Sequence, residues 1–217
     1  MKTGILGGTF NPIHQAHLQI AQDVLATCKL DRVLFIPAAQ PPHKEVAGAV
    51  SFAHRLAMVQ AAIADFPQFE VSDIELQRAG KSYSVDTLEL LKQNDPTEEF
   101  FFIIGLDSWR DIASWKDSSR LFGLAHIVVI TRPGIALQHP LEPLPVAMRQ
   151  EFCYHEGLVD IPHKSGNSLL ILTEKEMAVS STDIRHRVSQ GQPIRHLAPA
   201  PVVDYIERHG LFASPKL

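Results

Sequence analysis

Two histidines that follow a glycine-rich turn are the first residues whose types and spacing could do chemistry. The segment 7–17 reads GGTFNPIHQAH and follows a short apolar run, Gly4 to Leu6, that predicts a buried strand. Glycines let the backbone approach a ligand closely, and a helix starting near His14 would offer free N–H groups and a positive dipole end to an anion. His14 and His17 share one face of the first helical turn. This turn is therefore predicted to bind phosphate.

A second polar element lies near the end of the chain, where residues 179–187 read VSSTDIRHR. Serine hydroxyls before a helix are good N-caps, and with an arginine one turn on they also suit a phosphate. Taken alone, this pattern indicates a capped surface helix with solvated arginines. Because a triphosphate needs donors on two sides, the presence of the early turn favours phosphate binding here too.

Other interpretations of the early turn remain open. The chain has no GxxxxGK[ST] or GxGxxG pattern, which excludes an ordinary P-loop and a dinucleotide fingerprint. The glycines could simply form a tight turn and the histidines cap a helix. His14 and His17 could also form half of a zinc site with His43 as the third ligand.

The elements that must position these residues alternate between strand and helix. Short runs rich in β-branched and aromatic residues predict buried parallel strands at 4–6, 33–36, 69–71, 100–104 and 127–130. Helical periodicity predicts helices at 14–26, at 52–64 after a Ser51 cap, at 85–93 after a Ser84 cap, and at 108–124 with a break near Trp115. This order favours an α/β fold with a doubly wound, Rossmann-like parallel sheet.

The last third of the chain is less regular. Periodicity disappears from 133 to 168, which indicates a loop-rich insertion with a short helix around 146–152, before an apolar strand at 169–172. Helices are then predicted at 182–190 after Ser180 and Ser181, and at 202–208 with Gly210 as the stop. We expect one domain over residues 1–217, with a small C-terminal helical appendage at 180–212.

Composition excludes several classes of protein. The 217 residues include 45% hydrophobic and 20% charged residues, and the net charge of -4 gives no general field for nucleic acid or an anionic membrane. The start, MKTGILGGTF, lacks a signal-peptide pattern, so we expect a cytoplasmic protein. Cys28 and Cys153 form no CxxC pattern and are expected to be ordinary thiols.

The motifs together resemble a known family. Residues 7–17 are similar to the HxGH signature of the nucleotidylyl transferase superfamily, with Ala16 where glycine is usual and Asn11 for aspartate, and residues 180–185 are similar to its ISSTxIR motif. With IIGLDSW at 103–109, RPG at 132–134 and the ending VVDYIERHGLF, the whole chain resembles bacterial nicotinate-nucleotide adenylyltransferases.

This resemblance implies transfer of an adenylyl group from ATP, with Mg²⁺, to nicotinate mononucleotide. The acceptor phosphate attacks the α-phosphorus and expels pyrophosphate, so the protein must align two phosphates and neutralise charge. The catalytic residues are expected to be His14, His17, Lys44 and Arg185. The residues expected to bind ATP are Gly7, Gly8, Thr9, Phe10, His14, His17, Gly105, Asp107, Arg132, Ser180, Ser181, Thr182 and Arg185. Those expected to bind the acceptor are Ser84, Thr87, Trp115 and Lys44.

Three rival functions stay open at this point. The acceptor could be phosphopantetheine or nicotinamide mononucleotide, the protein could be a non-catalytic nucleotide sensor, or it could be a zinc hydrolase built on the two histidines. Spacing does not say which histidine meets which phosphate, and the sequence leaves the oligomeric state open.

Overall fold

The computed structural model describes residues 1–41, 50–77, 80–132, 139–173 and 179–214. Its strands are β1 (Lys2–Gly8), β2 (Arg32–Pro37), β3 (Phe69–Val71), β4 (Glu99–Gly105), β5 (His126–Thr131), β6 (Asp160–Pro162) and β7 (Ser168–Thr173). Its helices are α1 (Gln15–Thr27), α2 (Phe52–Ile63), α3 (Ser84–Asn94), α4 (Leu106–Arg110), the 3₁₀ turn η1 (Ile112–Ser114), α5 (Ser118–Leu124), α6 (Val146–Arg149), α7 (Ser181–Ser189) and α8 (Ala200–His209).

The strands form one sheet in the order β3-β2-β1-β4-β5-β7-β6. All neighbours pair in parallel except β6, which pairs antiparallel with β7 at the edge. The strand order reverses between β1 and β4, because the chain first builds outward through β2 and β3 and then returns. In open α/β sheets, ligands bind beyond the carboxyl ends of the strands at such a switch point. The doubly wound fold expected from the sequence is confirmed.

Both faces of the sheet are buried, which explains why its strands are continuous apolar runs rather than alternating ones. In β1, Leu6 packs with the core that includes α1, α2 and α8, whereas Ile5 packs with the core that includes α3 and α5. Phe101 and Phe102 of β4 divide in the same way. Neighbouring side chains of a strand point to opposite faces, so each run supplies two cores at once.

The expected strands and most helix boundaries are confirmed to within a few residues, with three differences. Tyr83, not Ser84, is the N-cap of α3, and Ser84 is the first helical residue. The break near Trp115 predicted for the helix at 108–124 is confirmed by extended backbone there, but the segment is divided further, into two short helices and a 3₁₀ turn, with left-handed backbone at Asp117. The edge strand β6 was not predicted from the sequence, because its three residues are too few for a periodic signal.

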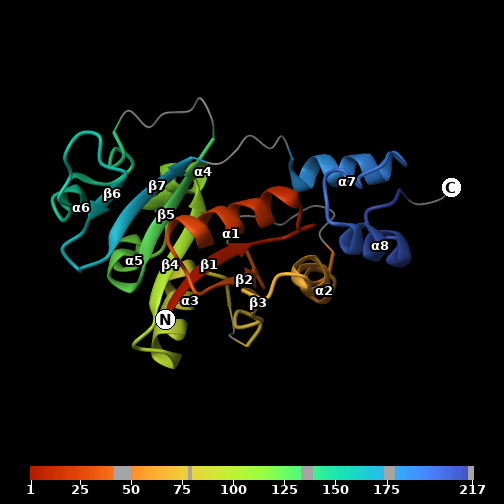
Figure 1. Cartoon of the computed structure of the whole chain (residues 1–217), viewed down its shortest axis with the longest axis horizontal. Coiled ribbons are helices and arrows are strands. Elements are labelled where there is room, and N and C mark those ends of the chain that lie inside the picture. The colour runs from red at the N-terminus through yellow and green to blue at the C-terminus, as the bar shows by residue number, and fades with distance from the viewer. Residues whose placement is uncertain (42–49, 78–79, 133–138, 174–178, 215–217) are drawn as a thin grey trace.

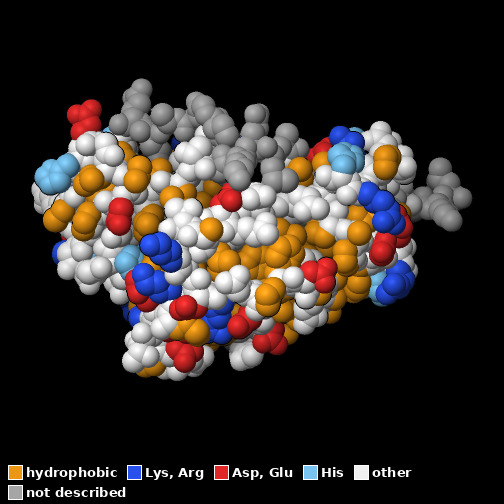
Figure 2. Space-filling view, in the orientation of Figure 1, with side chains coloured by type: hydrophobic (Ala, Val, Ile, Leu, Met, Phe, Trp, Pro, Cys, Tyr) orange, Lys and Arg blue, Asp and Glu red, His pale blue; other side chains and the backbone are white. Residues whose placement is uncertain are grey.

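The C-terminal helices lie at one end of the molecule and the segment with α6 and β6 at the other (Figure 1). Ile184 of α7 and Val202 and Ile206 of α8 are buried in the same core as α1 and α2. Charged side chains of both signs are scattered over the face in Figure 2, as expected for a net charge of -4. Within the described ranges, no helix is both long and apolar enough to cross a bilayer.

Candidate active site

Three adjoining cavities, of about 170, 380 and 530 Å³, follow the carboxyl ends of β1 and β4 at the switch point. Gly105 lines the first and second cavities, Thr9 the second and third, and Asp107 the first and third. They therefore form one cleft. The first cavity is the end near β5, the second is the central cavity, and the third is the outer cavity near the start of α3. The predicted residues that line it are Gly7, Gly8, Thr9, His17, Ser84, Thr87, Gly105, Asp107, Trp115 and Arg132.

The glycine turn brings backbone to the centre of the cleft. A Cβ added at Gly7 would meet no atom within 4 Å, so this position is open to a ligand. A Cβ at Gly8 would lie 3.3 Å from the ring of Phe10, whose own backbone is left-handed with φ 47°. Phe10 is buried and packs edge-on against His17, with ring centroids 5.1 Å apart. Phe10 thus supports the turn from within the core.

The two histidines differ in position. His14 is the N-cap of α1, buried, and its ring stacks on that of His17 at 3.8 Å, whereas His17 lines the central cavity. The backbone N–H of His14 donates to Nδ1 of His17 at 3.2 Å. Burial lowers the pKa of His17 well below 6.5, and the charge of His14 lowers it further. His17 is therefore neutral near pH 7, and because Nδ1 accepts, Nε2 carries the proton and is the available donor.

The start of α1 offers fewer backbone donors than expected. Gln15 N–H donates to the carbonyl of Leu197, and His17 N–H to the carbonyl of His14. The His14 N–H is used by His17. The prediction of free N–H groups is therefore wrong for these three residues, because the distant Leu197 carbonyl takes one of them and local bonds between His14 and His17 take the other two. The His17 ring and the glycine turn are what this element presents to a ligand.

The start of α7 is fastened to the same turn. Ser180 is its N-cap and accepts from Asp183 N–H, while the Ser181 hydroxyl donates to the Pro12 carbonyl at 2.8 Å. Arg185 donates from Nη1 to the Asn11 carbonyl at 2.8 Å and from Nη2 to Oγ1 of Thr182 at 3.2 Å. The structure thus brings the two predicted phosphate elements together, although Ser180, Ser181, Thr182 and Arg185 do not line the three cavities above.

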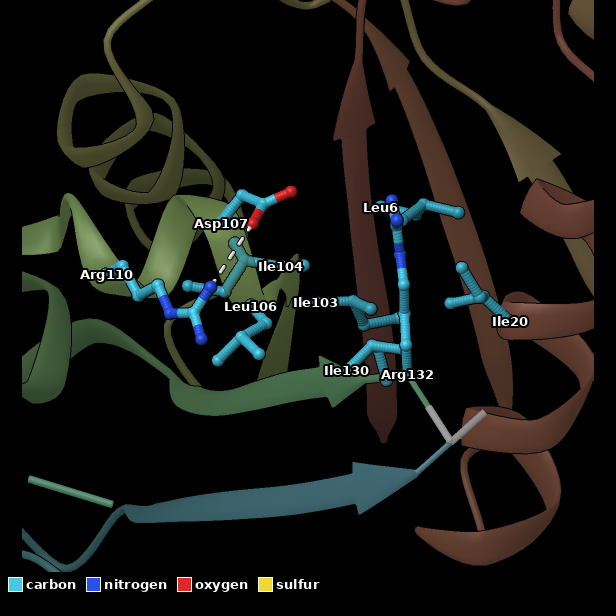
Figure 3. Close-up of a pocket in the computed structure, with 10 residues that line it drawn as sticks. Leu6, Ile20, Ile103, Ile104, Leu106, Asp107, Arg110, Ile130 and Arg132 are labelled. Carbon is cyan, nitrogen blue, oxygen red and sulfur yellow. Dashed lines mark ion pairs between the residues drawn. The ribbon is translucent and has the colours of Figure 1, made fainter. Parts of the chain in front are cut away.

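One end of the cleft lies between β4 and β5. Figure 3 shows Asp107 and Arg110 on α4 at one side of this cavity and Arg132 at the end of β5 on the other. Gly105 is the N-cap of α4, and Asp107 lies in its first turn, 3.8 Å from Arg110. Exposed charges surround an apolar floor that includes Leu6 and Ile103. Such a cavity suits an apolar ring that carries polar groups.

The other end lies at the start of α3. Ser84 and Trp115 line both the central and the outer cavity, and Trp115 is half-buried with its ring edge-on to Phe102. Trp109, by contrast, is fully buried, and its Nε1 donates to the Pro140 carbonyl. Thr87 also lines the cleft, but its hydroxyl donates to Oε1 of Glu75 at 2.9 Å. The hydroxyl hydrogen of Thr87 is therefore already used within the protein.

Comparison with known proteins identifies the family. The cytidylyltransferase-like family model matches residues 5–187. A relative from Syntrophotalea carbinolica, named probable nicotinate-nucleotide adenylyltransferase, is 56% identical over 99% of this chain and 98% of its own length. A relative of the same name from Geotalea uraniireducens is 50% identical, over 98% of each chain. The chain belongs to the nicotinate-nucleotide adenylyltransferase family.

Solved structures support the same fold. The nicotinic acid mononucleotide adenylyltransferase of Plasmodium falciparum complexed with NaAD matches with a TM-score of 0.73 at 18% identity, over 97% of both chains. The same enzyme complexed with APC matches with a TM-score of 0.70 at 17% identity, over 97% of this chain and 96% of that one.

Two residues expected in or near the family's site, Lys44 and the alternative ligand His43, lie outside the described residues. Among the residues that are described, no group of three or more His, Cys, Asp or Glu side chains could hold a metal ion. His14 and His17 stack ring on ring, and Nδ1 of His17 already accepts a backbone hydrogen bond.

Three residues of this nicotinate-nucleotide adenylyltransferase site were missed from the sequence. Glu75 lines the central cavity, Lys116 lines the outer one, and buried Arg55 donates to the Thr9 carbonyl at 2.8 Å. Lys116 pairs with Asp86 at 2.8 Å, which raises the pKa of Lys116. Burial lowers the pKa of Arg55, and the charge of Glu75 opposes this effect. For Arg55, the sequence signal that could have pointed to the site was a charged residue among the apolar residues of α2.

The burial of His14 predicts a pH-dependent stability. Burial lowers the pKa of His14 to about 4 from 6.5. As the pH falls below 6.5, His14 takes up a proton in the unfolded chain but stays neutral in the folded chain. The free energy of unfolding therefore decreases between pH 6.5 and about pH 4. Between about pH 7 and about pH 5 this loss is about 2 kcal/mol. Urea unfolding at the two pH values measures it. The free energy of unfolding of His14→Gln should decrease by about that much less over the same pH range. An equal decrease in both proteins would show that His14 is not the group responsible.

Proposed function

We propose that this enzyme transfers the adenylyl group of ATP to nicotinate mononucleotide, forming deamido-NAD and releasing pyrophosphate, a reaction of NAD biosynthesis. The observation that carries this proposal is the joining of the two phosphate elements at the switch point of the sheet. Arg185 and Ser181 contact the backbone of the turn that carries His17. Donors from both ends of the chain therefore meet beside one cleft, which the three adjoining cavities form.

In the proposed arrangement, adenosine occupies the end lined by Gly105, Asp107 and Arg132. The triphosphate crosses the glycine turn, and the acceptor occupies the end lined by Ser84 and Trp115. The acceptor phosphate attacks the α-phosphorus in the central cavity. Nε2–H of neutral His17 donates to an oxygen of the reacting phosphate, so it stabilises charge without having to give up its proton. The protein needs no nucleophile of its own, because the acceptor supplies it.

Arg185, Ser180, Ser181 and Thr182 are proposed to face the β- and γ-phosphates. Lys44 stays in the proposal as a further cation, on the resemblance alone. His14 is proposed to support the ring of His17, on which it stacks. Phe10 holds the turn from the core side.

Mg²⁺ is proposed as the metal that accompanies ATP. It prefers oxygen ligands, which the phosphates of ATP would supply. Because the exposed carboxylate of Asp107 belongs to the proposed adenosine end, the phosphates of ATP would supply most of the ligands of the ion. When bound, Mg²⁺ would neutralise charge on the departing pyrophosphate. A cytoplasmic location is also part of the proposal, since Cys28 and Cys153 are both free thiols.

The decisive experiment incubates the purified protein with MgATP and each acceptor in turn and measures pyrophosphate. Release with nicotinate mononucleotide is the expected result. Release only with phosphopantetheine or nicotinamide mononucleotide would assign a different transferase. ATP binding without any release would indicate a nucleotide sensor. Zinc in the purified protein, with hydrolysis that a chelator abolishes, would indicate the hydrolase.

Arg185→Lys is expected to lower kcat/KM by about tenfold or more although the charge is kept. The guanidinium donates in two directions, to Asn11 and Thr182, and an ammonium group cannot reproduce that fork. The matched control is Arg187→Lys on the same helix, whose guanidinium pairs with Asp183 at 2.9 Å. That control should stay within about twofold of the wild type. If Arg185→Lys is fully active while Arg185→Ala is inactive, only the charge matters and the fork argument fails.

A further inference from the structure

Glu75 is a buried carboxylate in the wall of the central cavity. It lies between β3 and α3 with 9% of its surface exposed. Its Oε1 accepts from the Thr87 hydroxyl at 2.9 Å, and its Oε2 accepts from the Ala39 N–H at 3.2 Å. Within the described ranges, it makes no ion pair. Two neutral donors hold the carboxylate in place and leave its charge without a direct partner.

The described residues balance the charge of this carboxylate only in part. Arg55 acts on it electrostatically, but the guanidinium donates to the Thr9 carbonyl and forms no ion pair with Glu75. A buried charge is costly unless something of opposite sign compensates it. A cationic ligand in the cleft would provide that compensation.

Hydrogen bonds place Glu75 between the phosphate turn and the start of α3. Ala38 N–H donates to the Gly8 carbonyl at 2.8 Å, the next residue binds Glu75, and Glu75 binds Thr87 one turn into α3. In nicotinate mononucleotide the ring nitrogen is bonded to the ribose that carries the phosphate, and the ring carboxylate lies on the far side. An acceptor with its phosphate at the turn and its carboxylate at Ser84 therefore has its nitrogen between them.

That nitrogen is quaternary and makes the ring a pyridinium cation. We propose that Glu75 is a specificity-determining residue that recognises the positive charge of the acceptor's pyridinium ring. This inference rests on the proposed function, because it takes the acceptor from it. Glu75 does not take part in the transfer itself, and Ser84 and the first N–H groups of α3 face the ring carboxylate.

The test compares two acceptors that differ in one ring atom. The first is nicotinate mononucleotide, and the second is the C-riboside 5′-phosphate of benzoic acid, whose ring has the same shape and carboxylate but carbon in place of the charged nitrogen. The wild-type enzyme should prefer the pyridinium acceptor by about tenfold in kcat/KM, mostly through KM for the acceptor. Glu75→Gln, which keeps an oxygen acceptor but loses the charge, should narrow the preference to within about threefold.

The matched control is Asp73→Asn, which removes a carboxylate from the same loop, where Asp73 binds Gln77 and does not line the cleft. It should keep the wild-type preference. Equal use of both acceptors by the wild-type enzyme would overturn the inference without any variant. So would a Glu75→Gln enzyme that loses activity equally with both, since that is the signature of a purely structural role. Failure of the wild type to use nicotinate mononucleotide at all would instead refute the proposed function.

Discussion

Replacing His17 with alanine is expected to lower kcat by about a thousandfold while changing KM for ATP by less than about threefold. Nδ1 of His17 accepts from the His14 backbone, so Nε2–H is the donor that this ring can offer in the central cavity that it lines. A donor fixed where charge develops acts mainly in the transition state, and its loss therefore appears in turnover. Steady-state kinetics with saturating nicotinate mononucleotide measure the effect.

Two further variants separate the roles of the two ring nitrogens. His17→Asn places an oxygen near Nδ1 and can keep the bond to His14 N–H, but it has no group at the position of Nε2. His17→Gln places an amide donor near Nε2. Glutamine should therefore retain about tenfold more turnover than asparagine. Turnover within a few-fold of wild type in the alanine variant would remove His17 from the catalytic set.

The enzyme is expected to prefer nicotinate over nicotinamide mononucleotide by at least about a hundredfold in kcat/KM. In the proposed acceptor end of the cleft, the donors nearest the start of α3 are the Ser84 hydroxyl, the first N–H groups of that helix and Lys116, whereas the carboxylates of Asp107 and Asp111 belong to α4 and the turn after it. A ring carboxylate accepts from these groups, whereas an amide would direct its own donors at them. Such mispairing in a closed site costs about 3 kcal/mol. Parallel rate measurements at equal MgATP test this.

Two serine variants test whether the start of α3 causes the preference for nicotinate mononucleotide. Ser84→Ala removes a donor that lines the cleft and should reduce the preference by about fivefold. Ser119→Ala, at an exposed position of α5, should leave it unchanged. Equal specificity constants for the two acceptors in the wild-type enzyme would show that this helix start does not read the ring substituent.

Local patterns were sufficient to predict most of the elements of this protein, although not the short edge strand β6. Buried parallel strands such as β4 are short apolar runs, and helix ends such as Ser51, Ser180 and Gly210 carry their own capping chemistry. Such features depend on neighbours in sequence, so they are visible without the fold. The alternation of strand and helix was then enough to predict the doubly wound sheet and the cleft at the ends of β1 and β4.

Contacts between distant residues could not be predicted in this way. Arg185 binds the carbonyl of Asn11, 174 positions away, and Glu75 is held in the cleft wall by one donor from the segment after β2 and one from α3. The same contacts decided that Gln15 N–H is used by Leu197 and the Thr87 hydroxyl by Glu75. A hydrogen-bond partner depends on which segments pack together. Hydrophobic periodicity shows which face of an element is buried, but not which distant segment covers it. The sequence by itself therefore determined the elements and the family, whereas tertiary structure decided which donors, acceptors and charges remain available to the substrates.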